Sequence, residues 1–386
     1  MNLRRKIEQE IRERGPIPFS RYMELCLYDA ELGYYSRNAE QFGKAGDFYT
    51  SSDVHAVFGR LLARQFEEIW RALGSPTQIE ILELGPGRGL FARDVLDWSA
   101  KKFPDFFAGL RYSLLERSPA LQGRLKETLD RFFESGKAFL APALAQCGLP
   151  GRNEENLTRA EGPLIVFANE FFDALPVEVV SEQGELRIVV ENGRLIETWA
   201  PPSAAALEFL DRYSVHPEAG ERVEAALAAQ TCMEQIAAAL ELGLVVTIDY
   251  GYTRAEQLAG RHRGTVTAYR RHSVSGNPYE APGEQDITAH VNFSALATAC
   301  ERNGMLPQRL VTQSQFLLGI GQHNEFADAF EECRLPQERA KVALQLKHLV
   351  TPAGMGESFH VLVASKGVDE AVVSGLSGLS FGKKPM

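Results

Sequence analysis

The chain has 386 residues, 45% of them hydrophobic, and a formal net charge of −10. This composition is typical of a chain that folds around a core and excludes a disordered protein, and the length suits one enlarged α/β domain or a core with an accessory lobe. The acidic balance argues against DNA as a partner and disfavours RNA, because binding to a nucleic-acid backbone requires a basic surface.

The five cysteines are dispersed and show neither a Cys-x-x-Cys pair nor zinc-ligand spacing. We therefore expect no metal site and a reducing compartment. No apolar run reaches the roughly 18 residues of a membrane span, and the charged N-terminal residues resemble neither a signal sequence nor a mitochondrial transit peptide. These features together predict a cytoplasmic protein without a membrane span.

Residues 1–74 are predicted to form a helical N-terminal extension. Apolar residues at every fourth position predict a helix over 2–14, which a Gly-Pro stretch ends before a second helix begins. The polar, glycine-containing segment 43–53 then leads into a helix over 54–73. Its composition suits a lid over a neighbouring site and, equally, an ordinary surface connection.

The stretch 79–89 is the one around which the chain is organised. An apolar strand over 79–84 is followed by glycine at every second position and then by a helix over 89–102. Small residues let a ligand lie against the backbone, and the free N–H groups at the helix start can meet a polar group. The predicted cofactor-binding residues of this turn are Glu83, Gly85, Pro86, Gly87 and Gly89.

Two kinds of cofactor favour such a turn. The dinucleotide fingerprint Gly-x-Gly-x-x-Gly would need its third glycine at position 90, which is Leu90. The third glycine lies instead at Gly89, and Glu83 precedes the first glycine by two residues. This pattern resembles motif I of the class I S-adenosylmethionine-dependent methyltransferases. A glycine-rich turn that binds no ligand remains the plain alternative.

Strands and helices alternate from residue 79 onward, which predicts a parallel sheet with helices on both faces. The second strand ends at Glu116, where nucleotide-binding sheets use a carboxylate to accept hydrogen bonds from two ribose hydroxyls. The fourth strand ends at Asn169 and the fifth carries Asp249. Because the carboxyl ends of parallel strands meet at one edge, we expect all three residues to converge on the glycine turn. A surface carboxylate is the alternative for Glu116.

The segment after the fourth strand predicts the acceptor side of the site. DNA amino-methyltransferases place an Asn/Asp-Pro-Pro-aromatic box there, whereas this chain has an acid and an aromatic residue in place of the prolines. Glu170 and Asp173 suit a cationic acceptor, since paired carboxylates match a forked guanidinium and can localise its charge on one nitrogen. We predict Glu170, Asp173 and Asn169 as catalytic residues, with Asn169 also contacting the cofactor.

Structural roles stay open for the same acids. Glu170 stands where a carboxylate stabilises the start of a helix. For Asp173 and Asp249 a purely structural role is about equally favoured by the residues alone.

Beyond residue 177 the pattern changes from parallel to antiparallel. Alternating apolar residues separated by Gln-Gly and Asn-Gly turns predict hairpins. A helix over 221–241 follows, and a loop over 253–286 is long enough to be functional or mobile. The predicted units are a helical extension with a lid loop, a first part of the core, an inserted antiparallel β subdomain, a second part of the core with the long active-site loop, and a flexible tail rich in Gly and Ser: 1–74, 75–180, 181–220, 221–365 and 366–386.

Several motifs occur in a fixed order along the chain: Gly33-Tyr34-Tyr35, Gly46-Asp47-Phe48-Tyr49-Thr50, Phe58-Gly59, Glu83-Leu-Gly85-Pro-Gly87-Arg-Gly89, Asn169-Glu-Phe-Phe-Asp-Ala-Leu-Pro176, Ile248-Asp-Tyr-Gly251 and Asp286-Ile-Thr-Ala-His-Val-Asn-Phe293. Over roughly 15–365 the chain resembles the MidA family of class I methyltransferase-like proteins. The mitochondrial members of that family are arginine methyltransferases needed to assemble respiratory complex I.

The resemblance implies an α/β fold with a seven-stranded, mostly parallel Rossmann-like sheet, S-adenosylmethionine as the cofactor, and a protein arginine as the acceptor in the mitochondrial members. It assigns the cofactor to Gly85, Gly87 and Gly89, the ribose to Glu116 and the acceptor side to 169–173. It also places Asp47 in a loop that closes over the cofactor. One departure concerns Thr50-Ser51-Ser52-Asp53, where the family commonly has Thr-Ala-Pro-Glu, so that the acid is shorter.

We therefore expect an S-adenosylmethionine-dependent methyltransferase that acts on a protein side chain, with arginine as the first choice. A non-catalytic assembly protein that keeps the fold is one alternative, and a small-molecule or RNA methyltransferase is another. The sequence determines neither the acceptor nor the oligomeric state, for which a homodimer is one option.

Overall fold

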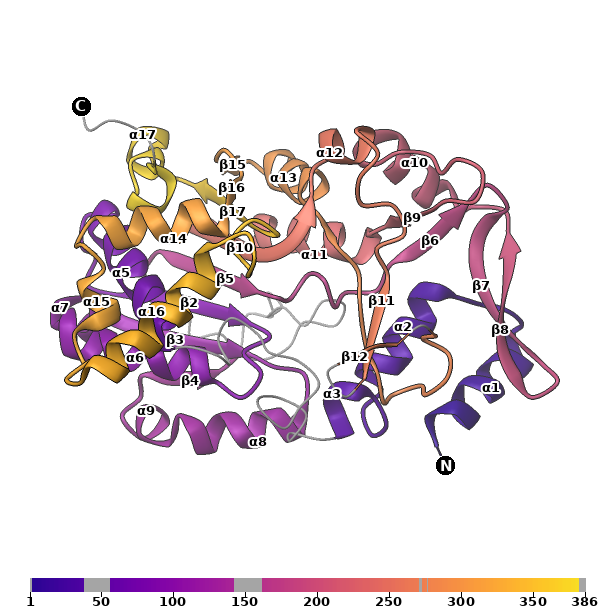
Figure 1. Cartoon of the computed structure of the whole chain (residues 1–386), viewed down its shortest axis with the longest axis horizontal. Coiled ribbons are helices and arrows are strands. Elements are labelled where there is room, and N and C mark those ends of the chain that lie inside the picture. The colour runs from indigo at the N-terminus through magenta and orange to yellow at the C-terminus, as the bar shows by residue number, and fades with distance from the viewer. Residues whose placement is uncertain (1, 38–55, 142–161, 271–272, 276, 382–386) are drawn as a thin grey trace.

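The computed structural model describes residues 2–37, 56–141, 162–270, 273–275 and 277–381. It shows an α/β core at one end of the molecule and a second lobe at the other, with the N-terminus in the second lobe and the C-terminus on the core (Figure 1). None of the described helices is both long enough and apolar enough to cross a bilayer.

The core is built on a mixed sheet that runs, among the described residues, through seven strands in the order β15-β17-β10-β5-β2-β3-β4. The neighbours from β4 to β10 are parallel, and β17 is antiparallel to β10. The strands are β2 (Ile79–Leu84), β3 (Leu110–Leu115), β4 (Ala138–Leu140), β5 (Leu164–Asn169), β10 (Gly243–Tyr252), β15 (Leu306–Pro307) and β17 (Phe359–Lys366), with the short β14 (Val291–Asn292) and β16 (Val311–Thr312) paired to β10 and β17. The predicted seven-stranded, mostly parallel α/β sheet is confirmed.

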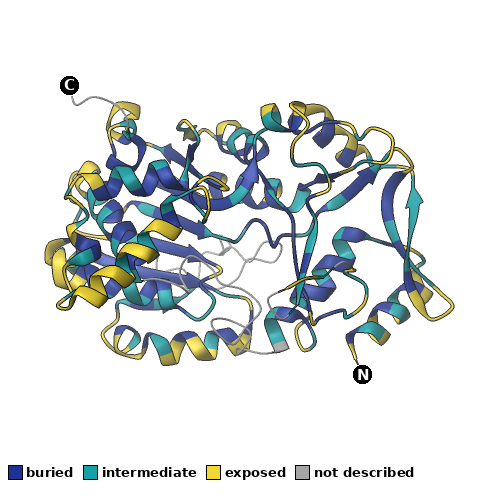
Figure 2. Cartoon of the chain, in the orientation of Figure 1, coloured by how far each residue is buried: buried dark blue, intermediate teal, exposed yellow. Residues whose placement is uncertain are grey.

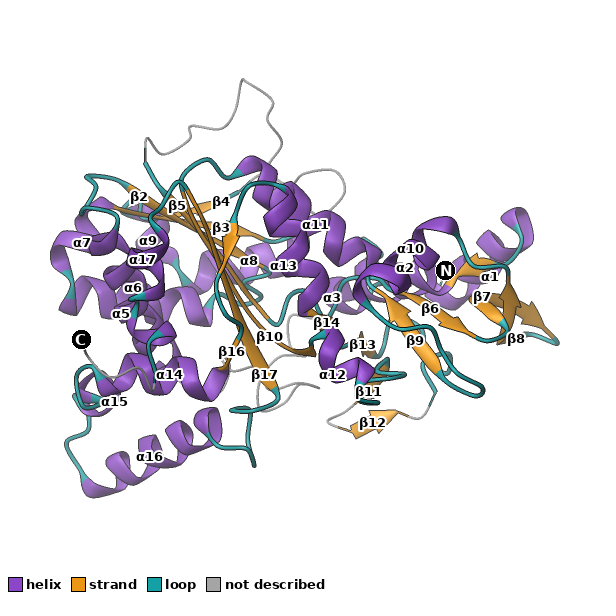
Figure 3. Ribbon diagram, turned by 90° about the horizontal axis from the view of Figure 1, so that it is seen from above, coloured by secondary structure: helices purple, strands orange, loops and turns teal. Residues whose placement is uncertain are grey.

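Helices cover both faces of this sheet because successive side chains of each strand point to opposite sides. On β5, Phe167 packs into one buried cluster and Val166 into the other. Figure 3 shows the sheet between the two helical layers. The cluster that contains Val166 includes residues of α11 (Leu227–Ala239) and α13 (Phe293–Arg302). The cluster that contains Phe167 includes residues of α5 (Ala56–Ala72), α6 (Leu90–Lys102), α7 (Pro104–Gly109), α8 (Pro119–Thr128), α9 (Asp130–Glu134), α14 (Gln313–Gln322), α15 (Ala327–Phe330) and α16 (Pro336–Val350).

The second lobe joins the N-terminal residues to the inserted hairpins. Its antiparallel sheet has the order β1-β7-β6-β9, with β8 paired to β7, and Ile17 on β1 lies opposite Ile188 on β7. The N-terminal extension therefore completes the hairpin sheet. The elements of the lobe are α1 (Leu3–Arg14), β1 (Ile17–Pro18), α2 (Phe19–Tyr28), α3 (Tyr34–Arg37), β6 (Glu178–Ser181), β7 (Gly184–Glu191), β8 (Arg194–Ala200), α10 (Ala204–Tyr213) and β9 (Arg222–Ala225).

The start of the predicted helix over 221–241 is wrong. Residues 222–225 form β9, which pairs with β6, and α11 begins only at Leu227. Val223 and Ala225 are buried in the second lobe, so the alternation of a strand prevails there over helical periodicity. The buried carboxylate of Glu224 also accepts a hydrogen bond from the Thr265 backbone N–H at 2.7 Å, which ties this strand to the following segment.

The segment 253–286, predicted as one long loop, is interrupted by a short helix and by strands. It holds a three-stranded antiparallel sheet in which Ala268 lies opposite Ile287. Both residues are buried, and their burial offsets the polar composition that suggested a loop. The elements are α12 (Arg254–Leu258), β11 (Thr267–Arg270), β12 (Ser273–Ser275) and β13 (Asp286–Thr288). Because β13 packs against α2, we count this small sheet as part of the second lobe.

Most of the tail 366–386, predicted to be disordered, is ordered as far as residue 381. It forms α17 (Glu370–Ser374) and a 3₁₀ turn (Ser377–Leu379), and Figure 2 shows buried residues in this segment. Val373, Leu376 and Leu379 are buried against the core, and an added Cβ at Gly378 would lie 2.5 Å from the Phe316 ring. Glycine is thus required there for close packing, not for flexibility.

One core helix is missed by the sequence analysis. The strands β15 and β16 are two residues each, and α14 begins at Gln313. The Thr312 side chain accepts a hydrogen bond from the Gln315 N–H, and the Gln315 side-chain oxygen accepts one from the Thr312 N–H. This capping box overrides the strand propensity of the preceding residues.

Candidate active site

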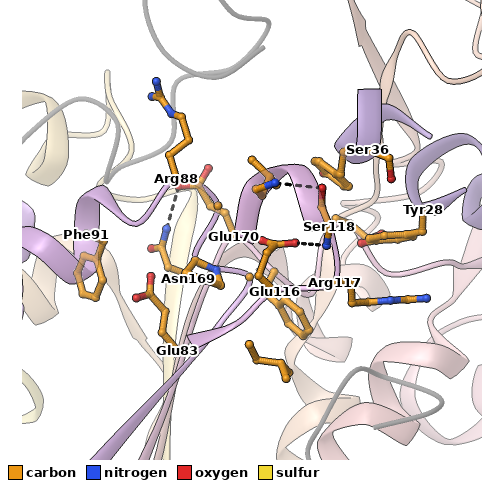
Figure 4. Close-up of a pocket in the computed structure, with 18 of the residues that line it drawn as sticks. Tyr28, Ser36, Glu83, Arg88, Phe91, Glu116, Arg117, Ser118, Asn169 and Glu170 are labelled. Carbon is orange, nitrogen blue, oxygen red and sulfur yellow. Dashed lines mark hydrogen bonds between the residues drawn. The ribbon is translucent and has the colours of Figure 1, made fainter. Parts of the chain in front are cut away.

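A cavity of about 340 Å³ opens at the carboxyl edge of the central sheet. Its volume lies at the lower end of the range of small-molecule sites. Figure 4 shows Glu83, Phe91 and Asn169 on the core side and Tyr28 and Ser36 on the side of the second lobe. The residues that line it come from both parts of the molecule: Tyr28, Ala30, Tyr35, Ser36, Glu83, Gly85, Pro86, Gly87, Arg88, Leu90, Phe91, Leu115, Glu116, Arg117, Ser118, Pro119, Leu121, Asn169, Glu170, Phe171, Asp173, Ala174 and Asp286.

The glycine turn forms one wall of the cavity. Gly85 and Gly87 have φ of 63° and 54°, a conformation that disfavours residues with a side chain. An added Cβ at Gly85 would lie 3.0 Å from the Phe171 ring, whereas at Gly87 it would meet no described atom within 4 Å. Gly87 therefore leaves space over the backbone for a ligand.

Gly89 has a different position. It does not line the cavity, and an added Cβ would lie 2.7 Å from Leu125 and 3.2 Å from Leu129. With a φ of 76° it precedes the first residue of α6. Its visible role is to let α6 pack against α8, and its contact with a cofactor stays a prediction.

Glu83 is buried at the end of β2 and lines the cavity. Its Oε2 accepts a hydrogen bond from the Tyr112 hydroxyl at 2.9 Å. Burial raises the pKa of Glu83 to about 8, and the neighbouring Glu116 adds to the increase. At neutral pH this carboxyl is therefore largely protonated and able to donate a hydrogen bond into the cavity.

Glu116 directly follows β3, as predicted, and also lines the cavity. Its Oε1 accepts a hydrogen bond from the Ser118 backbone N–H at 2.8 Å, which orients the carboxylate. Burial raises the pKa of Glu116 to about 7, although backbone N–H groups and Arg117 oppose this shift. A buried carboxylate held in this way has acceptor capacity left for a pair of ligand hydroxyls.

The turn after β5 places Asn169 and Glu170 beside the glycine turn. Glu170 has a φ of 49°, an uncommon conformation for a residue other than glycine. Its Oε1 accepts a hydrogen bond from Asn169 Nδ2 at 3.1 Å (Figure 4). In the described part of the chain nothing donates a hydrogen bond to the buried Oδ1 of Asn169. Such strain and unmet capacity commonly mark a functional site.

Asp173 lies at the end of the same turn, and its side chain is buried against the cavity. The Tyr250 hydroxyl donates a hydrogen bond to its Oδ2. No described residue donates a hydrogen bond of ordinary geometry to its Oδ1. Burial raises the pKa of Asp173 to about 6, and the hydrogen bond from Tyr250 moderates the increase.

Asp249 does not reach the cavity, contrary to the expectation that it converges with the other acids. It is fully buried, and its Oδ2 accepts hydrogen bonds from the backbone N–H groups of Phe171, Phe172 and Asp173 at 3.2, 3.0 and 3.3 Å. Burial raises its pKa, and the negative charge of Asp173 adds to the effect. Asp249 therefore supports the turn and takes no part in binding a ligand.

Two predicted features lie outside the described residues, namely Asp47 and the segment 50–53. The cavity residues that were not predicted as site residues include Tyr28, Tyr35 and Asp286. The last two occur in motifs that carry the family resemblance, which was the available signal for them. Among the described residues, no group of three or more His, Cys, Asp or Glu side chains is arranged to hold a metal ion.

Comparisons with known proteins agree with this geometry. Residues 61–311 match the sequence model of a family described as "Putative S-adenosyl-L-methionine-dependent methyltransferase". The chain belongs to this methyltransferase family.

Curated relatives are similar in sequence to this methyltransferase over most of its length. It is 29% identical to "Protein arginine methyltransferase NDUFAF7 homolog, mitochondrial" of Drosophila melanogaster, over 95% of this chain and 85% of that one. It is 27% identical to the Homo sapiens "Protein arginine methyltransferase NDUFAF7, mitochondrial", over 92% and 81% of the two chains. A crystal structure of a Burkholderia thailandensis protein bound to S-adenosyl-homocysteine has a TM-score of 0.81 and 28% identity, and covers 99% of this chain and 95% of that one.

S-adenosylmethionine is the cofactor of this methyltransferase. The residues of the cavity fit it on three independent points. Gly87 leaves room for a ligand over the backbone. Glu116 offers a carboxylate at the position where nucleotide-binding sheets hold a ribose. Asn169 Oδ1 accepts no hydrogen bond from the described residues and can accept one from the cofactor. Family membership confirms the predicted activity and cofactor, whereas the role of each site residue stays a prediction.

Proposed function

We propose that this methyltransferase transfers the methyl group to an arginine side chain of a protein. The observation that carries the proposal is the pair of carboxylates, Glu170 and Asp173, that face the cavity from the turn next to the glycine turn. The Drosophila and human relatives are both named protein arginine methyltransferases, which supports the same acceptor.

The charge of the cavity favours a cationic acceptor. Its described lining holds five carboxyl groups and two arginines. A guanidinium keeps its charge in proteins and presents N–H donors in a planar fork, so two carboxylates can bind it at once. A neutral base gains less from these carboxyl groups because it lacks the positive charge, and ionised carboxylates repel a phosphate.

When bound, S-adenosylmethionine supplies a methyl group on a sulfonium, so that transfer breaks the methyl C–S bond, forms a C–N bond to the acceptor and releases one proton from that nitrogen. Glu170 and Asp173 orient the guanidinium, which raises the effective concentration of the attacking nitrogen. Asp173 Oδ1, which has no described hydrogen-bond donor, takes the released proton. A carboxylate whose pKa is raised to about 6 is a better base than an exposed aspartate.

The proposal is tested by incubating the purified protein with methyl-labelled S-adenosylmethionine and lysate from cells that lack it. We expect label in protein, and acid hydrolysis should recover it as methylarginine. Label recovered only in RNA or in a small molecule would contradict the proposal. Protein that binds the cofactor but transfers no label to any fraction would favour the non-catalytic alternative.

A further inference from the structure

The second lobe contributes one carboxylate to the lining of the cavity. Asp286, on β13, is 6% exposed and lines the same cavity as Asp173. The Tyr35 hydroxyl donates a hydrogen bond to its Oδ1 at 2.9 Å. Tyr35 comes from α3, so two segments of the second lobe together fix the position of this acid.

The backbone holds Asp286 and Asp173 in one arrangement. Three residues after Asp286, the Ala289 N–H donates a hydrogen bond to the Asp173 carbonyl at 2.9 Å. Burial raises the pKa of Tyr35, and the negative charges of Asp286 and Asp173 both add to this increase, which places both acids near the same hydroxyl. The two carboxylates therefore line the same cavity, one from the core and one from the second lobe.

Without a ligand, two buried carboxyl groups in one cavity lower the stability of the folded protein. Asp173 is 4% exposed, and no described residue donates a hydrogen bond of ordinary geometry to its Oδ1. Two acids buried in one cavity repel each other and lose part of their hydration, and a cation with several donors bound between them offsets both effects. The unmet acceptor on Asp173 is thus an independent sign that a donor binds at this point.

We propose that Asp286, oriented by Tyr35, is the second arm of the acceptor subsite, and that the acceptor guanidinium binds between Asp286 and Asp173. The inference rests on the proposed function and deepens it, because it makes the second lobe the part that selects the acceptor. The rings of Tyr28 and Tyr35, with centroids 5.5 Å apart, provide flat apolar surface beside the two acids.

A guanidinium fits this subsite better than an ammonium. Its N–H groups point in several directions in one plane, so it donates to both carboxylates at the same time. Its faces are weakly hydrated and stack on aromatic rings. An ammonium is a compact, strongly hydrated charge and loses more on entering an apolar slot.

The test compares Asp286→Asn with Glu284→Gln in protein saturated with S-adenosyl-homocysteine. Glu284 is exposed, outside the cavity lining, and bonded to Arg270 at 2.6 Å, so its substitution is a matched loss of charge on the same segment. The probes are N-acetyl-arginine amide and its neutral isostere N-acetyl-citrulline amide, titrated by calorimetry. The affinity of each protein for S-adenosyl-homocysteine itself is measured in parallel.

We expect wild type and Glu284→Gln to bind the arginine probe and to prefer it over the citrulline probe. Asp286→Asn should weaken the arginine probe at least about tenfold, the loss that one charge-assisted hydrogen bond represents, with cofactor affinity unchanged. Tyr35→Phe keeps the ring and removes the orienting hydroxyl. It should reduce the preference for arginine over citrulline and raise the KM for the acceptor, with little change in kcat.

Equal binding of the arginine probe by Asp286→Asn and wild type would overturn the inference, even if methylarginine forms in the lysate. Absence of methylarginine from the wild-type reaction would instead contradict the proposed function, while the titration would still report on the subsite. If Asp286→Asn does not fold, an unchanged preference for arginine in Tyr35→Phe overturns the inference.

Discussion

Asp249 Oδ2 accepts a hydrogen bond from the Phe172 backbone N–H at 3.0 Å, and this contact fixes the turn that carries the acceptor-side residues. The flanking N–H groups of Phe171 and Asp173 point to the same oxygen, and Glu170 begins the turn in a left-handed conformation. A carboxylate outside the cavity therefore sets the geometry inside it.

Replacement of Asp249 by alanine removes the acceptor for four backbone N–H groups, the three of the turn and that of Tyr250, and two of the four are on buried residues. We expect the free energy of unfolding to fall by about 2–4 kcal/mol, the usual cost of leaving buried donors unsatisfied. Urea denaturation followed by circular dichroism measures it. Asp249→Asn keeps one acceptor oxygen and should lose less. Equal stability of all three proteins would show that the turn does not depend on this side chain.

Replacement of Gly87 by valine places a side chain in the cavity. It should lower the affinity for S-adenosyl-homocysteine at least about tenfold, because the added methyl groups occupy space that the ligand needs. Gly136→Val is the matched control, since Gly136 also has a positive φ, 66°, and open space around it but does not line the cavity. Both variants carry similar backbone strain, so equal loss of affinity in both would contradict the assignment of the glycine turn.

The raised pKa of Glu83 makes the stability of the unliganded protein depend on pH. Since its folded-state pKa is about 8 and its ordinary value is 4.5, protonated Glu83 favours the folded state, and this stabilisation is lost as pH rises from about 4.5 to 8. Glu83→Gln cannot ionise. The unfolding free energy of this variant relative to wild type should therefore increase by about 2 kcal/mol from pH 6 to pH 8. Thermal melts at both pH values measure the difference, and a constant difference would contradict a buried, protonated Glu83.

The hydrogen bond from Tyr250 to Asp173 predicts a shift in the pH profile of methyl transfer. Asp173 must be ionised to bind a guanidinium, so kcat/KM should fall as pH drops through about 6. Tyr250→Phe removes a hydrogen bond that lowers this pKa, and the midpoint should move to higher pH. Tyr252→Phe is the control, because its hydroxyl bonds to Gln257 instead. Identical midpoints in all three proteins would exclude Asp173 as the titrating group.

The parts of this structure that follow from short-range patterns were predictable. The apolar strands 79–84, 164–168 and 243–252 and the glycine turn each carry their signal within a few residues. The convergence of Glu116 with Asn169 follows from a rule of parallel sheets and not from any contact that the sequence shows.

The remaining features depend on contacts between distant segments. The short strands β11 and β13 form where Ala268 is paired with Ile287 and both are buried, a contact that the polar sequence around them does not indicate. In the same way, Asp249 and Asp173 look alike in the sequence, and only the fold directs one carboxylate to backbone N–H groups and the other to the cavity.

The central claim is that the glycine turn and the turn 169–173 form one site for methyl transfer to arginine. Labelled transfer to protein arginine by wild type and Glu170→Gln, with S-adenosyl-homocysteine affinity measured on the same samples, tests it most directly. We predict that Glu170→Gln binds the cofactor as wild type does and loses about 100-fold or more of its transfer rate, because a charged contact that orients the guanidinium is gone. Equal rates of methylarginine formation by the two proteins would contradict the claim.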